Sequence, residues 1–246
     1  MHLSSQHTFM FLKYLRRLLV LIFGLFLCSV GIVCTYRSGM GLGPWDVLHQ
    51  GVSRHTPLSF GQASILVGGL VILAGLLLKV YPGVGTVLNM LLIGWFVDLQ
   101  LQSNWLPDLH TMPLLLRLFA DAMGVLLMGI GTAFYITPRL GAGPRDGLMM
   151  RLYILTRVRI AFVRAALECS ALSLGFFLGG AVGVGTLLFA FGVGPSVEVG
   201  FWLTKKLAFI VGPPPVAAPR PGAQKLASDL APRHPASHPV DQHSSL

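Results

Sequence analysis

The chain has 246 residues, of which 54% are hydrophobic and only 11% are charged. A soluble domain usually carries about 25% charged residues, so this composition excludes a water-soluble globule and indicates a membrane protein. The net charge of +9 does not indicate nucleic-acid binding, because the basic residues are spread along loops and form no patch interleaved with aromatic residues.

Six apolar stretches are long enough, or nearly so, to cross a bilayer, which takes roughly 20 residues. In chain order they are 18–36, 63–80, 84–101, 114–136, 160–180 and 184–202. Basic residues precede the first stretch as in a signal peptide, but its length and the lack of an Ala-x-Ala-like cleavage site favour a retained span. Pro195 lies inside the sixth stretch and is expected to kink or break it. The predicted fold class is therefore all-α, a polytopic membrane protein.

The two ends of the chain differ from the membrane domain predicted at 13–210. Residues 1–12 are polar and are predicted to be a frayed N-terminus. Residues 211–246 are rich in Pro, Ala, Ser and His, so they cannot bury enough apolar surface to offset the entropy of ordering, and we expect a disordered tail.

A repeat with a constant offset of 100 residues runs through the membrane domain. GLGPWD at 41–46 matches GAGPRD at 141–146, and GVGT occurs at both 83–86 and 183–186. This predicts two halves, 11–110 and 111–210, with three spans each. Because three is odd, the second half must enter the membrane from the opposite side, which is the inverted-topology repeat of many secondary transporters.

The distribution of basic residues gives separate evidence on orientation. With the N-terminus in the cytoplasm, all of the 18 Lys and Arg residues except Arg37, Arg54 and Arg117 fall on or toward the inside. We therefore expect six spans with both termini in the cytoplasm. The first Gly-Pro motif would then face the outside and the second would face the cytoplasm.

Each Gly-x-Gly-Pro-x-Asp motif predicts a short helix that starts at its proline, Pro44 or Pro144, and continues over 45–53 or 145–155. Glycine permits a tight turn and close backbone approach, proline suits the first helical position, and aspartate favours the positive end of the helix dipole. Such helices could be interfacial or re-entrant, and their N-termini could bind an anion. Alternatively, the motif only ends one helix and starts the next. The candidate binding residues of the motifs are Gly41, Gly43, Pro44, Asp46, Gly141, Gly143, Pro144 and Asp146.

Polar residues in or near the spans form a second set of candidates, since ionisable groups in a membrane usually face a bundle interior or a wet cavity. Asp121 and Glu168 each follow an arginine by four residues, Arg117 and Arg164, so each pair shares one helix face. These groups could line a pathway for an unknown small solute, or they could be structural pairs or groups that reach the interface. The candidates of this set are His49, Asn89, Asp121, Arg164, Glu168 and Glu198.

No catalytic set is visible, and no phosphate-binding loop occurs. The three cysteines form no CxxC pair, and no His, Cys or acidic cluster has metal-ligand spacing. We expect no enzymatic activity, no metal and no cofactor.

Four stretches of the first half are distinctive: GLGPWDVLHQG at 41–51, SFG at 59–61, PGVGT at 82–86 and LIGWFVD at 92–98. Together they closely resemble the YczE branch of the YczE/YyaS/YitT bacterial membrane proteins. The resemblance covers about residues 11–210 and is less tight in the second half, where Arg145 stands in place of Trp45. It implies a bacterial integral membrane protein, but it implies no substrate, cofactor or catalytic residue.

Two classes of function agree with these observations. The first is a small transporter or permease of the bacterial inner membrane with an unknown solute. The second is a non-transporting scaffold or regulator, whose cytoplasmic tail and arginine-rich loop bind a partner or anionic lipid at the cytoplasmic face of the bilayer. The arginines of that loop are Arg145, Arg151, Arg157 and Arg159.

Overall fold

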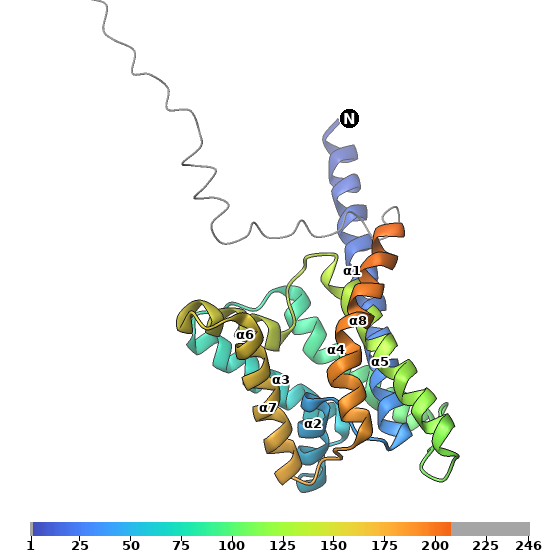
Figure 1. The fold of residues 1–246 in the computed structure, drawn as a ribbon. Helices are drawn as coiled ribbons and strands as arrows, with labels where there is room; N and C mark the ends of the chain where they lie inside the picture. The colour runs from blue at the N-terminus through green and yellow to red at the C-terminus, as the bar shows by residue number, and fades with distance from the viewer. Residues whose placement is uncertain (1, 208–246) are drawn as a thin grey trace, which may run out of the picture. The chain divides into compact units, whose positions relative to one another are not determined.

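The computed structural model of the chain describes residues 2–207, and all regular structure in this range is helical (Figure 1). The helices are α1 (His2–Ser38), α2 (Pro44–His55), α3 (Phe60–Leu77), α4 (Val84–Ser103), α5 (Leu114–Ile136), α6 (Pro144–Thr156), α7 (Ile160–Phe177) and α8 (Val184–Lys206). The predicted all-α fold is thus confirmed for this range. The tail predicted at 211–246 lies outside the described residues.

Within the described range, six helices are long and apolar enough to cross a membrane: α1 from Met10 onward, α3, α4, α5, α7 and α8. They coincide with the six predicted stretches, and the bounds of α5 match the prediction to the residue. The largest difference is at the start, because α1 begins at His2 and continues through the residues predicted to be frayed. A continued helix pairs the backbone N–H groups of this segment with its own carbonyls.

α8 continues through Pro195, so the sixth span is not broken there, while the alternative of a kink stays a prediction. A proline removes one intrahelical hydrogen bond and crowds the carbonyl four residues earlier, but the turns on both sides of Pro195 stay helical. One further polar group is satisfied locally, because the hydroxyl of Ser196 donates to the carbonyl of Gly192 at 2.8 Å.

Glycines bring α1 and α5 into a close antiparallel pair (blue and green in Figure 1). A Cβ added at Gly24 would stand 2.7 Å from the carbonyl oxygen of Gly131, and one at Gly131 would stand 2.6 Å from that of Gly24. Gly31 and Gly124 make the same reciprocal contact, at 2.5 and 2.7 Å. The offset of 100 residues converts one contact into the other. Because the pair is antiparallel, the two Gly-Pro motifs follow α1 and α5 at opposite ends of it.

Each half of the chain also packs against the other through its short helix. α2 packs against α7, and α6 packs against α3. α4 packs beside α1, and α8 packs beside α5. Each short helix therefore packs on a span of the opposite half. The motif that starts it also contacts the opposite half.

The first glycine of each motif fits into the start of a span in the other half. Gly41 and Gly141 have φ values of 120° and 138°, which an L side chain rarely adopts. A Cβ at Gly41 would stand 2.8 Å from Oγ1 of Thr186, and one at Gly141 would stand 2.9 Å from Oγ1 of Thr86. Both the backbone conformation and the space therefore require glycine.

Backbone hydrogen bonds join the same segments. The N–H of Gly85 donates to the carbonyl of Leu140, and the N–H of Gly185 donates to the carbonyl of Met40, both at 2.8 Å. The GVGT runs at 83–86 and 183–186 are thus hydrogen-bonded to the residues just before the Gly-Pro motif of the other half. This packing explains why the two sequence features recur together.

The packing between the second and third spans differs between the two halves. α3 packs along α4, and Asp98 of α4 accepts hydrogen bonds from the hydroxyl of Ser59 and, at 2.8 Å, from the N–H of Gly61. The equivalent helices α7 and α8 have no comparable interface in the described chain. Glu198, the counterpart of Asp98, is exposed on α8.

Candidate functional site

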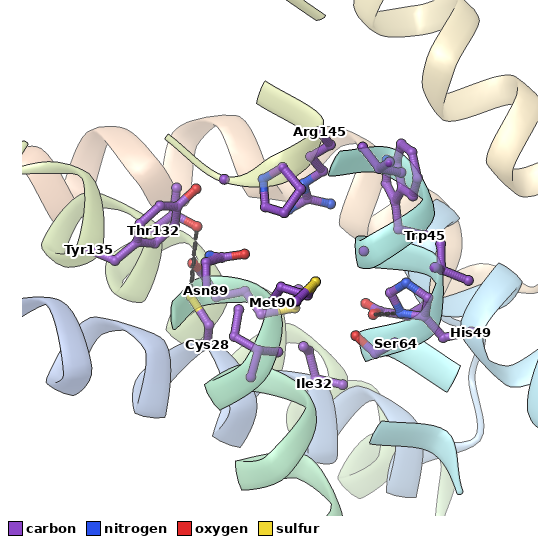
Figure 2. A pocket seen from close by; sticks show the side chains of 18 residues that line it. Cys28, Ile32, Trp45, His49, Ser64, Asn89, Met90, Thr132, Tyr135 and Arg145 are labelled. Atoms are coloured by element: carbon purple, nitrogen blue, oxygen red, sulfur yellow. Dashed lines mark hydrogen bonds and ion pairs between the residues drawn. The ribbon is translucent and has the colours of Figure 1, made fainter. Parts of the chain in front are cut away.

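The starts of α2 and α6 border one cavity, here named chamber one, whose empty volume is about 750 Å³, including the part open to the outside. Figure 2 shows Arg145 between Asn89 on one side and Trp45 and His49 on the other. The polar side chains of the lining are those of Asp46, His49, Ser64, Asn89, Thr132, Tyr135 and Arg145.

A second cavity, chamber two, lies among α5, α6, α7 and α8 and has an empty volume of about 770 Å³, with its open part included. Its lining includes Asp146, Arg164 and Glu168. The two chambers share a wall made of Trp45, Thr132, Tyr135 and Arg145.

The two chambers are built from equivalent positions of the two halves. Residues that line chamber one recur in chamber two at the offset of 100. The pairs include Trp45 and Arg145, Asp46 and Asp146, His49 and Met149, Ser64 and Arg164, Gly68 and Glu168, and Asn89 and Phe189. Positions 45 and 145 are related by the same offset, and both border both cavities. The repeat is therefore seen in the cavity linings as well as in the backbone.

A carboxylate and an imidazole meet on the first turns of α2. Asp46 is buried, and its Oδ1 lies 3.3 Å from Nδ1 of His49, without the geometry of a hydrogen bond. The imidazole is charged only if protonated, and its ring stands edge-on to Phe60 with 6.1 Å between centroids. This packing fixes the imidazole beside the carboxylate at the edge of chamber one.

Arg145 is the one fixed cation of the shared wall. It follows Pro144, the first residue of α6, and it keeps accessible surface. No hydrogen bond or ion pair links its guanidinium to another residue in the range 2–207. A cation left without a fixed partner beside a cavity is available to a ligand.

Three polar groups converge on Gly143, just before α6. The hydroxyl of Tyr135 donates to Oδ2 of Asp146 at 3.0 Å. A Cβ at Gly143 would stand 3.0 Å from that oxygen, 3.2 Å from the tyrosine hydroxyl and 3.7 Å from Oδ1 of Asn89. Glycine at this position therefore allows Tyr135, Asp146 and Asn89 to crowd together at the cavity wall.

Chamber two also holds the predicted pair on α7. Nε of Arg164 lies 2.9 Å from Oε1 of Glu168, so the shared helix face predicted from their spacing is confirmed as an ion pair. The two charges satisfy each other and leave Arg145 and Asp146 as the remaining charges of this lining.

Two candidates of the second set, Asp121 and Glu198, lie apart from both chambers. Asp121 is fully buried against the end of α1, where it accepts a hydrogen bond from the Ser38 hydroxyl at 3.0 Å. Arg117 does not pair with it but donates to the carbonyls of Ser38 and Gly39 at 2.8 and 3.0 Å, because the last carbonyls of a helix lack intrahelical partners. Glu198 is exposed on α8 and lines neither cavity.

The motif residues divide into two groups. Asp46, Gly143, Pro144 and Asp146 line a chamber, together with His49, Asn89, Arg164 and Glu168 of the second candidate set. Gly41, Gly43, Pro44 and Gly141 line neither chamber and serve the turns and helix starts.

Sequence reasoning assigned no cavity role to Trp45, Thr132, Tyr135 or Arg145, although all four form the shared wall. One signal was present for two of them. Arg145 and Trp45 occupy the position at which the two motif copies differ in charge. Nothing in the sequence singles out Thr132 or Tyr135 from the other residues of an apolar span.

Six membrane-length helices around cavities that are lined in part by polar side chains define a multi-pass membrane protein. The chain belongs to a family of unknown function, DUF6198, whose model matches residues 15–200. It is 40% identical over 179 residues to an uncharacterized protein of Haemophilus influenzae. The aligned region covers 73% of this chain and 80% of that protein.

Two relatives in Bacillus subtilis support the same assignment. The uncharacterized membrane protein YczE is 33% identical over 204 residues, 78% of this chain and 93% of YczE. The uncharacterized protein YyaS is 29% identical over 168 residues, 67% of this chain and 82% of YyaS. The resemblance to YczE and YyaS is thus confirmed. No solved structure matches the chain.

Proposed function

We propose that the protein is a small permease of the bacterial cytoplasmic membrane, with both termini in the cytoplasm and the two halves inserted in opposite orientations. The observation that carries this proposal is the pair of chambers built from equivalent positions of the halves, with one shared wall. Transporters with inverted repeats bind their solutes where the repeats meet. The bias of Lys and Arg toward one side supports the orientation.

The difference between the halves supports alternating access. In the first half, Asp98 ties α4 to the start of α3, while in the second half chamber two separates α7 from α8. When the halves exchange conformations, α3 moves away from α4 and α7 closes on α8. The solute then passes from one chamber to the other across the wall formed by Trp45 and Arg145.

A labelling experiment tests this proposal without knowledge of the solute. Single cysteines replace Ser64, which lines chamber one, and Leu167, which lines chamber two, in a chain whose three native cysteines are changed to serine, because Cys28 itself lines chamber one. We expect a membrane-impermeant thiol reagent to reach Ser64→Cys from one side of the membrane and Leu167→Cys from the other. Labelling of both positions from the same side only, or of neither position, would contradict the permease.

A binding or scaffold role is the second candidate, and a surface near the end of α6 favours it. Arg157 and Arg159 are exposed there, beside the exposed apolar side chains of Leu155 and Val158. Basic and apolar side chains together suit the headgroup region of an anionic membrane. Under this alternative, changing both arginines to glutamine or deleting residues 212–246 alters the cellular phenotype, whereas Asp46→Asn, Asp146→Asn and Glu168→Gln do not.

A further inference from the structure

The charges that border the two chambers indicate the class of solute they accept. Arg145 borders both chambers and has no hydrogen bond or ion pair to another described residue. Each chamber adds one motif aspartate, Asp46 in chamber one and Asp146 in chamber two. The remaining charges of chamber two, Arg164 and Glu168, neutralise each other at 2.9 Å. A solute in either chamber therefore meets one guanidinium and one carboxylate, and in chamber one the imidazole of His49 lies 3.3 Å from that carboxylate.

Unmatched charges are costly where water is scarce, so this lining selects against a solute with a single charge. An anion would pair with Arg145 but would lie close to a carboxylate. A cation would pair with that carboxylate but would lie close to Arg145. A neutral solute would offer a group of opposite charge neither to Arg145 nor to the aspartate of the chamber. Only a molecule with one group of each sign matches both.

We infer that the chambers bind a small zwitterion, whose anionic group pairs with Arg145 and whose cationic group pairs with Asp46 in chamber one or with Asp146 in chamber two. The inference rests on the proposed permease function and names its substrate class. Amino acids and aminosulfonic acids have this chemistry. The hydroxyl of Tyr135 and the amide of Asn89 supply neutral hydrogen-bonding groups beside these charges.

The asymmetry of the repeat assigns separate roles to the two ends of the solute. The aspartate is present in both halves, but the position of Arg145 is occupied by Trp45 in the first half. The anionic group therefore stays paired with Arg145 as the solute moves between chambers. The cationic group leaves the carboxylate of one chamber and pairs with the equivalent carboxylate of the other, Asp46 or Asp146.

Binding to the full-length protein in lipid nanodiscs tests the inference. Each radiolabelled zwitterion is compared with its two singly charged analogues: leucine with 4-methylpentanoate and 3-methylbutylamine, glycine with acetate and methylamine, and taurine with ethanesulfonate and ethylamine. We expect saturable binding of at least one zwitterion, about ten-fold or more tighter than either analogue in its set, because each analogue loses one charged hydrogen bond. Tighter binding of an analogue, or no saturable binding of any zwitterion, overturns the inference.

Charge variants provide a second, independent readout. Arg145→Gln leaves the carboxylates in place, so it is expected to weaken zwitterion binding about ten-fold or more and to make the amine the best ligand of its set. Arg145→Lys keeps the charge and should retain the preference for the zwitterion. Arg157→Gln, an exposed arginine outside both chambers, is the matched control and should change nothing. An unchanged ranking of ligands in folded Arg145→Gln overturns the inference.

Flux in proteoliposomes separates this inference from the permease proposal. Zwitterion binding without protein-dependent uptake rejects the permease and keeps the zwitterion site. Protein-dependent uptake of a singly charged analogue alone keeps the permease and overturns the zwitterion site. Uptake of the zwitterion in preference to its analogues supports both.

Discussion

The close contact between α1 and α5 predicts that Gly124→Ala destabilises the protein. The new Cβ would stand 2.7 Å from the carbonyl oxygen of Gly31, 2.7 Å from Cγ2 of Thr35 and 3.1 Å from Cβ of Cys34. Two of these three atoms are backbone or Cβ atoms, so the methyl group fits only if the helices move apart. Overpacking of this kind costs about 1–3 kcal/mol.

Gly69→Ala in α3 is the matched control, because its Cβ would meet only Sδ of Met90, at an ordinary 3.8 Å. Both substitutions gain up to about 1 kcal/mol of helix propensity, and this gain cancels in the comparison. Gly124→Ala should therefore be about 1–3 kcal/mol less stable than Gly69→Ala. Far-UV circular dichroism during titration from dodecylmaltoside into dodecylsulfate micelles measures the difference. Equal stability of the two variants would refute the close backbone contact.

The equivalent substitution Gly24→Ala should have a similar effect, because its Cβ would stand 2.7 Å from the carbonyl oxygen of Gly131. Combined with Gly124→Ala, it should cost less than the sum of the two single changes, since one separation of α1 from α5 relieves both clashes. Full additivity would show that the two contacts relax independently.

Three further predictions concern the halves and the shared wall. Asp98→Asn weakens the charge-assisted bonds from Ser59 and Gly61 and should lower stability by about 1–2 kcal/mol in the same titration, whereas Glu198→Gln, at the exposed equivalent position, should have no measurable effect. Tyr135→Phe removes the hydroxyl that donates to Asp146, so folded protein should bind its solute more weakly by about 1 kcal/mol; unchanged affinity would exclude a role for this bond in the site. Reporter fusions after residues 55 and 150 should report opposite sides of the membrane, and the same side for both would contradict the inverted orientation of the halves.

The spans and the starts of the short helices could be predicted because their causes are local. Bilayer thickness fixes the length of an apolar span, and the six predicted stretches agree with the helices. Glycine, proline and aspartate in fixed order specify a helix start within a few residues, and α2 and α6 begin at Pro44 and Pro144 as predicted. Pro195 was expected to kink or break the sixth span, and the turns around it remain helical, so no break occurs.

The candidate site was less predictable because it depends on contacts between the halves. Arg145 borders a cavity with Asn89 only because α6 packs against a span of the other half. The partner of Asp121 is Ser38, which is 83 positions away in the chain, whereas spacing along one helix pointed to Arg117. Periodicity within a segment indicates which residues share a face, but it does not indicate which element covers that face.

The glycine contact between α1 and α5 has a consequence for the origin of the shared wall. The offset of 100 residues exchanges the two glycine contacts, so the interface of α1 and α5 as a whole is equivalent to that of a two-fold symmetric dimer of half-length chains. In such a dimer the positions of Trp45 and Arg145 would carry the same side chain. Two arginines would repel each other, and two tryptophans would provide no charge. Joining the halves in one polypeptide lets these positions diverge, so that a single guanidinium serves both cavities.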